Sequence, residues 1–274
     1  MLELIFVIAI LGIVSSIGAS IIAHVYESYI VNRAQHRASI KSEQTLNQIS
    51  NRLRYAIPGT VGARVTTGSA FIPLTEISST VTRNVLQWVG YDGDSFEAIS
   101  SNTATGAARR PGWSGFIDLD ASSTTTLVTP GSNLGLASEI ITNLGGSLSN
   151  ARIYFADALG SVPVSAGSSG ENINVTGLAS GNTIPERYKL AWSSYAIVFD
   201  GSDLWLYYNF TPTVGATLGA NKSLLLSNVT TFSFKGSEGS IRIKVCQYIY
   251  FDSNDYTDAD ADAAHSCKEK IILY

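Results

Sequence analysis

The chain begins with an uninterrupted apolar run, from Leu4 to Ala23, in which no residue carries a formal charge. About twenty residues in an α-helix extend over roughly 30 Å, which is the thickness of the hydrocarbon core of a bilayer. One acid, Glu3, stands immediately before this run. A carboxylate in lipid costs about 3 kcal/mol. The pattern therefore favours an apolar helix whose leading acid is retained for a partner.

The helical pattern continues well past the apolar run. Four apolar residues recur at spacings of three and four, as one buried stripe of a helix should: Leu46, Ile49, Leu53 and Ile57. Pro58-Gly59 follows and predicts the end of the helix. A helix of about 55 residues is about 80 Å long, so its second half needs something to pack against. We expect residues 1–25 to be a membrane or filament-core half and residues 26–57 to pack on a head domain.

Residues 58–274 change to a β-strand and loop pattern. Short apolar runs between Gly, Ser and Thr predict strands, at Val85–Val89, Phe116–Leu119, Thr124–Val128 and Arg152–Ala156. Residues 161–183 are mostly Gly, Ser, Asn and other small residues, which predicts surface loops. Two hairpins are expected, around Gly201-Ser202 and around residues 236–239, followed by a last strand over 268–274. The fold class is therefore α+β: a long N-terminal helix followed by an antiparallel β-sheet head.

Composition limits the classes of function. Only 15% of the residues are charged and the net charge is −4, which disfavours a dedicated nucleic-acid binder without excluding a local basic patch. The two cysteines, Cys246 and Cys267, lie near the C-terminus and predict one disulfide in an oxidising compartment. No Gly-x-Ser-x-Gly sequence and no phosphate-binding Gly-rich loop occurs, so we expect no enzymatic activity.

Two ordinary interpretations of the N-terminal segment remain as alternatives. A cleavable secretory signal needs a basic region before a shorter apolar core, and here no Lys or Arg precedes Arg33. A simple single-span anchor fits the length. However, Arg33, Arg37 and Lys41 all follow the segment, and the positive-inside rule then places the C-terminal part in the cytoplasm. That orientation conflicts with the predicted disulfide.

Residues 1–14, Met-Leu-Glu-Leu-Ile-Phe-Val-Ile-Ala-Ile-Leu-Gly-Ile-Val, resemble the N-terminal helix of type IV pilins and type II secretion pseudopilins. The resemblance implies a basic leader that a prepilin peptidase removes, and N-methylation of the new N-terminus. The acid of that family lies four residues beyond this terminus, so we expect the leader and about two mature residues to precede Met1. It also implies that Glu3 neutralises the N-terminal amine of a neighbouring subunit, because a buried carboxylate is tolerated only when it is paired.

Residues 225–245 are weakly similar to the last sheet of larger minor pilins and J-type pseudopilins. The expected function is thus a structural subunit, a minor pilin or pseudopilin, of a type IV pilus or type II secretion filament. Its expected partners are other such subunits, the peptidase and methylase, and the bacterial inner membrane, with the head in the periplasm before assembly into a periplasmic or extracellular filament. The alternative is a membrane-anchored periplasmic binding or adhesion module, in which some of the four tryptophans form a stacking platform.

The segment between the cysteines is acidic and contains no Lys or Arg between residues 252 and 262. Clustered carboxylates repel one another unless they are solvated or bridged by a cation, and ligands that are all oxygen favour Ca²⁺. The candidate ligands are Asp252, Asn254, Asp255, Asp258, Asp260 and Asp262. Asp258, Asp260, Asp262 and Glu269 have EF-hand spacing, but Ala263 occupies the position of the turn glycine. Calcium binding and an acidic solvated loop both stay open.

Overall fold

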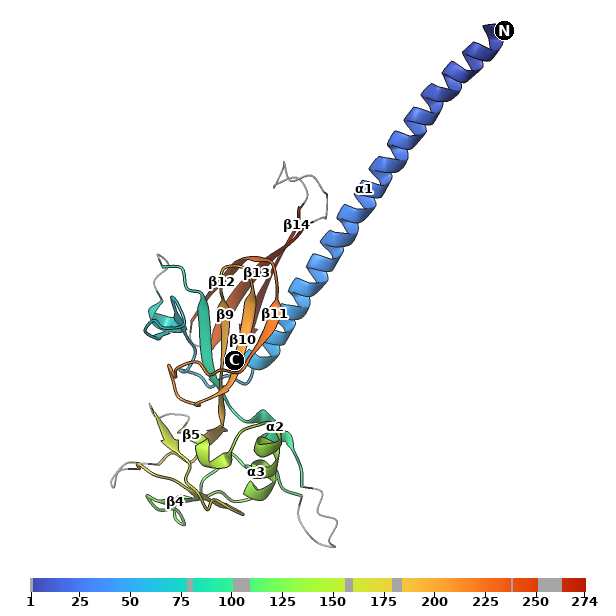
Figure 1. The fold of residues 1–274 in the computed structure, drawn as a ribbon. Coiled ribbons are helices and arrows are strands. Elements are labelled where there is room, and N and C mark those ends of the chain that lie inside the picture. Colours follow the sequence, from blue (N-terminus) through green and yellow to red (C-terminus); the bar gives the residue numbers. More distant parts are fainter. Residues whose placement is uncertain are drawn as a thin grey trace.

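The computed structural model describes residues 2–77, 81–100, 109–155, 160–178, 184–237, 239–250 and 263–274. One long helix, α1 (Leu2–Leu53), leads into a β-rich head (Figure 1). All strand pairs of the described residues are antiparallel. A disulfide joins Cys246 to Cys267. The predicted α+β class, with its long helix, antiparallel sheets and C-terminal disulfide, is confirmed.

Two sheets form the part of the head nearest α1. The larger sheet has the order β11-β10-β9-β3-β1-β2. Its strands are β1 (Gly62–Arg64), β2 (Ile72–Pro73), β3 (Val85–Gly90), β9 (Ser193–Phe199), β10 (Leu204–Phe210) and β11 (Lys222–Leu226). The smaller sheet has the order β12-β13-β14, with β12 (Val229–Ser237), β13 (Ser240–Tyr250) and β14 (Ala263–Leu273). A short 3₁₀ turn, η1 (Leu74–Glu76), follows β2 and lies near β12.

The second half of α1 packs into the core that these two sheets share. Leu46, Ile49 and Leu53 are at most 2% exposed, and they belong to one cluster with Trp88 of β3 and Ile243 of β13. The predicted apolar stripe is confirmed for these three helical residues. Burying a side chain of this size contributes about 1.5–3 kcal/mol, so tertiary packing, rather than helix propensity alone, holds this half in place.

The helix ends at Leu53, before the predicted end at Pro58. Residues 54–57 of the expected helical range 26–57 join the sheet region instead. Ala56 forms an isolated bridge with Gly90, and the Ile57 amide donates to the Val89 carbonyl at 2.9 Å. Ile57 is buried as predicted, at 5% exposed, but in a separate small cluster. Backbone bonding to β3 therefore replaces the last helical turn.

A second body lies beyond the end of α1 (Figure 1). It contains β4 (Thr126–Val128) paired with β7 (Asn172–Asn174), and a sheet of order β6-β5-β8. These last three strands are β5 (Arg152–Phe155), β6 (Ser161–Pro163) and β8 (Tyr188–Ala191). Its helical elements are α2 (Gly93–Glu97), α3 (Leu134–Asn143) and the 3₁₀ turn η2 (Leu148–Asn150). This body has its own apolar cluster, around Leu127, Ile141 and Ile153.

Helix α3 illustrates how local sequence defines an element of this body. The Asn133 side chain accepts a hydrogen bond from the Leu136 amide and caps the start of the helix. Leu134, Ala137 and Ile141 point into the core at helical spacing. Gly145, with a φ of 88°, follows the helix in the left-handed region that glycine adopts without strain. Sequence analysis did not predict this helix.

Two other expectations for the head are wrong. Residues 161–183 are not all surface loop, because Val164, Ile173 and Val175 are at most 3% exposed in the second core. The buried residues are single apolar residues among small polar ones. Such a pattern has no regular period, so it does not predict their burial. Phe116–Leu119 forms isolated bridges, Phe116 with Arg187 and Asp118 with Val128, and no strand. The two hairpins and the final strand are confirmed.

Candidate functional site

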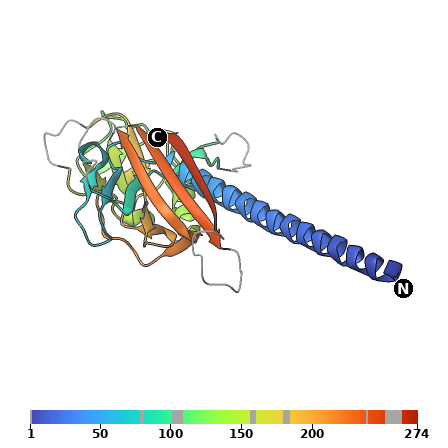
Figure 2. The ribbon, with the colours of Figure 1, turned by 90° about the horizontal axis from the view of Figure 1, so that it is seen from above.

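The N-terminal half of α1 exposes apolar side chains on every side. Figure 2 shows it leaving the head with no other element beside it. The exposed large apolar residues of this half are Leu4, Ile5, Phe6, Val7, Ile8, Ile10, Leu11, Ile13, Val14, Ile17, Ile21, Ile22, Val25, Tyr26, Tyr29, Ile30 and Val31. Apolar patches larger than a few hundred Å² are rare on soluble monomers and mark interaction surfaces. This half is therefore a surface for lipid or protein.

By length and composition, α1 is the one helix in the described chain that can cross a membrane. Glu3 lies in its first turn and is exposed, and it forms no ion pair with another described residue. The next acid along the helix is Glu27, whose carboxylate lies 3.4 Å from His24 Nδ1. Glu3 is thus separated from every other carboxylate of α1 by the whole apolar run.

The opposite end of α1 is fixed to the head by small and polar contacts as well as by the core. Ala38 and Ser42 are fully buried on the face that continues the stripe. Lys270 Nζ of β14 donates to Asn47 Oδ1 at 2.7 Å, and Thr45 Oγ1 donates to the Leu225 carbonyl at 3.3 Å. The helix therefore has one half bound to the head and one half free of it.

The disulfide fixes the sheet on which α1 packs. Cys246 of β13 lies directly opposite Cys267 of β14 in the strand register, and their sulfurs are bonded across the pair. The link closes a loop with a sequence separation of 21 residues. In the chain-entropy model, a loop of this length is worth about 3 kcal/mol. The C-terminal strand is consequently held against β13 by a covalent bond as well as by the ladder.

The candidate calcium ligands lie outside the described residues: Asp252, Asn254, Asp255, Asp258, Asp260 and Asp262. Within the described residues, no three His, Cys, Asp or Glu side chains lie close enough together to hold a metal ion. Of the residues with EF-hand spacing, only Glu269 is described, and its carboxylate binds Arg242 at 3.1 Å. Calcium binding at residues 252–262 stays a prediction.

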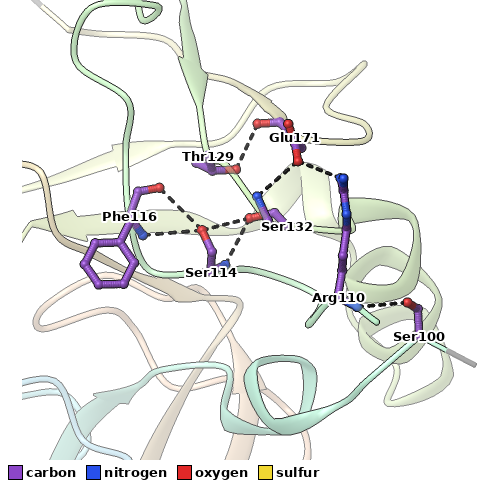
Figure 3. Close-up of polar contacts among 8 residues, drawn as sticks. Ser100, Arg110, Ser114, Phe116, Thr129, Ser132 and Glu171 are labelled. Carbon is purple, nitrogen blue, oxygen red and sulfur yellow. Dashed lines mark hydrogen bonds and ion pairs between the residues drawn. The ribbon is translucent and has the colours of Figure 1, made fainter. Parts of the chain in front are cut away.

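A cluster of hydroxyl groups with one ion pair lies in the second body (Figure 3). Arg110 binds the Glu171 carboxylate at 2.6 Å, and the amide of Gly131 donates to the same oxygen at 3.0 Å. The hydroxyl of Ser132 donates to that of Ser114 at 3.2 Å and accepts from the Ser114 amide at 2.9 Å. These bonds hold three loop segments together, so the cluster has a structural role.

The one carboxylate of this cluster, that of Glu171, bonds Arg110 and the Gly131 amide and no described hydroxyl group, so it does not activate a hydroxyl as a nucleophile. His24 and His36 are exposed on α1, and His265 is exposed on β14 with its ring 6.2 Å from that of Tyr248. Tyr188 is buried in the second core, and burial raises the pKa of its hydroxyl. The described geometry therefore does not assemble a nucleophile with an activating base.

The tryptophans do not form a single stacking platform. Trp88 lies in the core shared with α1, whereas Trp113 lies in the second core. Trp205 is partly exposed on β10, donates to Asp200 Oδ2 at 2.9 Å and lies 4.5 Å from Lys222 Nζ. Trp192 borders a polar cavity of about 790 Å³. Two of the four tryptophans thus serve packing, and Trp192 lines a large cavity.

Comparison of the chain with protein-family models, with curated proteins and with solved structures finds no match. Functional interpretation therefore depends on the geometry of α1 and of the head. Sequence reasoning located the apolar helix, Glu3 and the disulfide. It missed two buried arginines, Arg64 and Arg83. No periodic or motif signal distinguishes them from exposed arginines.

Proposed function

We propose that this chain is a structural subunit of a filament, a minor pilin or pseudopilin of a type IV pilus or a type II secretion assembly. One observation carries the proposal: α1 is a single helix with a wholly exposed apolar half and a head-packed half. Before assembly, lipid surrounds the exposed apolar half of α1. After assembly, the same half packs against the helices of neighbouring subunits. The small residues Gly12 and Gly18, which have open space around them, allow close approach of another helix.

In this function Glu3 selects the neighbour. A carboxylate buried in a helix bundle is stable only with a paired charge, and the N-terminal amine of an adjacent subunit provides one. A prepilin peptidase and methylase prepare that terminus. Before assembly the helix spans the inner membrane, and the head lies in the periplasm, where the disulfide forms. The periplasm is an oxidising compartment, so the disulfide agrees with the location proposed for the head.

The test compares Glu3→Ala and Glu3→Gln with a control, Glu27→Gln, on the same helix. Removing one member of a buried charge pair costs about 3–5 kcal/mol, so we expect at least a tenfold loss of subunit from sheared filaments. Membrane insertion is expected to stay normal, because both substitutions leave the span apolar. Glu27, exposed and near His24, is expected to be dispensable. Wild-type incorporation of Glu3→Ala would contradict the pairing role.

A second candidate is a membrane-anchored periplasmic binding module. The observation that favours it is the cavity beside Trp192, which Asn209 and Arg152 also line. Such a cavity with an aromatic side chain and several polar groups has the character of a small-ligand site. Crosslinking in intact membranes distinguishes the two functions. Crosslinks between the α1 helices of different subunits favour the filament. If only uncrosslinked single chains are found, the anchored module is favoured.

A further inference from the structure

The head contains two buried arginines with opposite surroundings. Arg64 is 8% exposed, and all three of its guanidinium nitrogens are bonded, to Gln87, to the Ser69 carbonyl, and to the carbonyls of Gly215 and Ala216. Arg83 is 9% exposed, yet its Nε is buried without a hydrogen-bond partner. A buried donor without an acceptor is destabilising. Arg64 therefore has a structural role, whereas Arg83 lacks the acceptor that a structural role would supply.

Arg83 lines a cavity of about 570 Å³ between β12 and the segment that includes η1. Lys235 of β12 lines the same cavity. The ion pairs of the described residues involve His24, Arg110 and Arg242, so Arg83 and Lys235 form no ion pair with a described carboxylate. The cavity thus presents two cationic side chains, and its electrostatic character favours an anion.

The remainder of the cavity wall combines apolar side chains with three hydroxyl residues, Thr75, Thr82 and Ser233. Leu74 and Phe232 are 4% exposed, and Phe234 is partly buried with its ring centroid 5.3 Å from that of Phe232. Gly236 allows the close approach of Leu74, because a Cβ at this glycine would lie 2.8 Å from Leu74 Cδ2. An anion that fits both parts of the wall has an apolar group beside its charge.

The cavity lies away from the strands on which α1 packs. The helix packs against β14 and β13, and β12 is the strand at the other edge of that sheet (Figure 1). A ligand beside β12 therefore does not compete with the contacts that hold α1 to the head.

We propose that this cavity binds a carboxylate carried by a short apolar or aromatic group. The carboxylate accepts hydrogen bonds from the Arg83 guanidinium, which is suited to a planar two-oxygen acceptor. Lys235 adds a second positive charge, and Phe232, Phe234 and Leu74 contact the apolar group. A singly charged carboxylate suits this wall better than phosphate, because a more highly charged ion loses more hydration on entering a partly apolar cavity. The carboxylate can belong to a free acid or to the C-terminus of a peptide.

The first test titrates the full chain in nonionic detergent by calorimetry with 4-phenylbutyrate, 4-phenylbutanol and inorganic phosphate. We expect the acid to bind at least about tenfold more tightly than the alcohol, since a hydrogen bond to a charged group adds roughly that factor. Phosphate is expected to bind more weakly than the acid. Equal affinities for the acid and the alcohol would overturn the proposal, as would phosphate binding as tightly as 4-phenylbutyrate.

Variants assign the binding to this cavity. Arg83→Gln is expected to reduce the affinity for 4-phenylbutyrate to that for the alcohol, and Arg187→Gln, an exposed arginine over the Phe116 ring, is the matched control that leaves it unchanged. Unchanged affinity in Arg83→Gln refutes the site. Should circular dichroism show that this variant is unfolded, Lys235→Gln and Phe234→Ser, at less buried positions, must each weaken binding severalfold; wild-type affinity in both refutes it equally.

A final comparison identifies the source of the carboxylate. The tripeptide Ala-Ala-Phe is titrated with a free C-terminus and as its amide. Tighter binding of the free tripeptide than of 4-phenylbutyrate, with loss in the amide, indicates a peptide C-terminus. The opposite order indicates a small free acid. The result does not depend on filament assembly, so it tests the cavity separately from the function proposed for α1.

Discussion

The two halves of α1 share one backbone conformation but have opposite relations to their surroundings. From Leu4 to Val31 apolar side chains are exposed on all sides, whereas from Ala34 to Leu53 one face is buried in the head. An isolated helix in water is only marginally stable. The head-packed half obtains its stability from tertiary contacts, whereas the exposed half has no such contacts along most of its length.

The comparison teaches that hydrophobicity alone does not predict where a residue lies. The exposed half is the more apolar of the two, and the buried half includes Ser42 and Thr45 on its buried face. What distinguishes them is the angular distribution of apolar residues: all around the helix in the first half, and along one stripe in the second. An all-around distribution is typical of a membrane span or a helix in the centre of a bundle.

Truncating one residue in each half is the strongest test of this difference. Leu53 is fully buried, and Leu53→Ala is expected to lower the free energy of unfolding of the head by about 2–5 kcal/mol. Ile13 is 62% exposed, and Ile13→Ala is expected to change it by less than about 0.5 kcal/mol. Denaturant unfolding in detergent, followed by tryptophan fluorescence, measures both. Similar effects of the two substitutions would mean that the exposed half also contributes to the folding of the head.

Breaking the disulfide tests how the head holds its half of α1. The double variant Cys246→Ser/Cys267→Ser is expected to lose about 3 kcal/mol, the value of a loop of this length. Since β14 packs against α1, amide hydrogen exchange should become faster in residues 34–53. The N-terminal part of the exposed half leaves the head with no other element beside it (Figure 2), so its exchange in the same micelles serves as the internal control. Equal acceleration in both halves would contradict a local effect.

Sequence alone predicted the parts of the fold that have a regular period. Helix α1, the β9–β10 hairpin and the β12–β13 hairpin all follow from spacing and turn residues. The end of α1 did not follow, because Ile57 continues the helical spacing while its amide bonds to Val89. Local pattern cannot reveal a backbone partner more than thirty residues away.

The second body was predicted least well, for a related reason. Its core collects single apolar residues, such as Val164 and Ile173, from segments rich in Gly, Ser and Asn. The cavity at Arg83 could not be predicted either, because Leu74 and Phe234 are far apart in the sequence and come together only in the folded protein. Glu3 was noticed because an acid before an apolar run is conspicuous without any tertiary information.

The smallest expected effect concerns pH at the junction between the helix end and the second body. The Tyr91 amide donates to the carbonyl of Tyr55, just past α1, and the Asp92 amide donates to Leu190 of β8. Asp92 is 2% exposed; burial raises the pKa of its carboxyl above the ordinary value of 3.8, and hydrogen bonds from Ser95 oppose this. The folded protein therefore holds this proton more tightly than the unfolded chain does.

The sign of the effect follows from linkage. Between the ordinary and the raised pKa, the folded state binds more protons, so the contribution of Asp92 to stability falls as pH rises. Asp92→Asn stays neutral and retains an oxygen that can accept from the Ser95 amide at the start of α2. The stability of this variant relative to wild type, measured by denaturant unfolding, should thus increase as pH rises above the ordinary Asp value of 3.8. If the difference in stability between Asp92→Asn and wild type does not change with pH, the prediction is wrong. Water then reaches the Asp92 carboxyl at the junction, and burial does not penalise its charge.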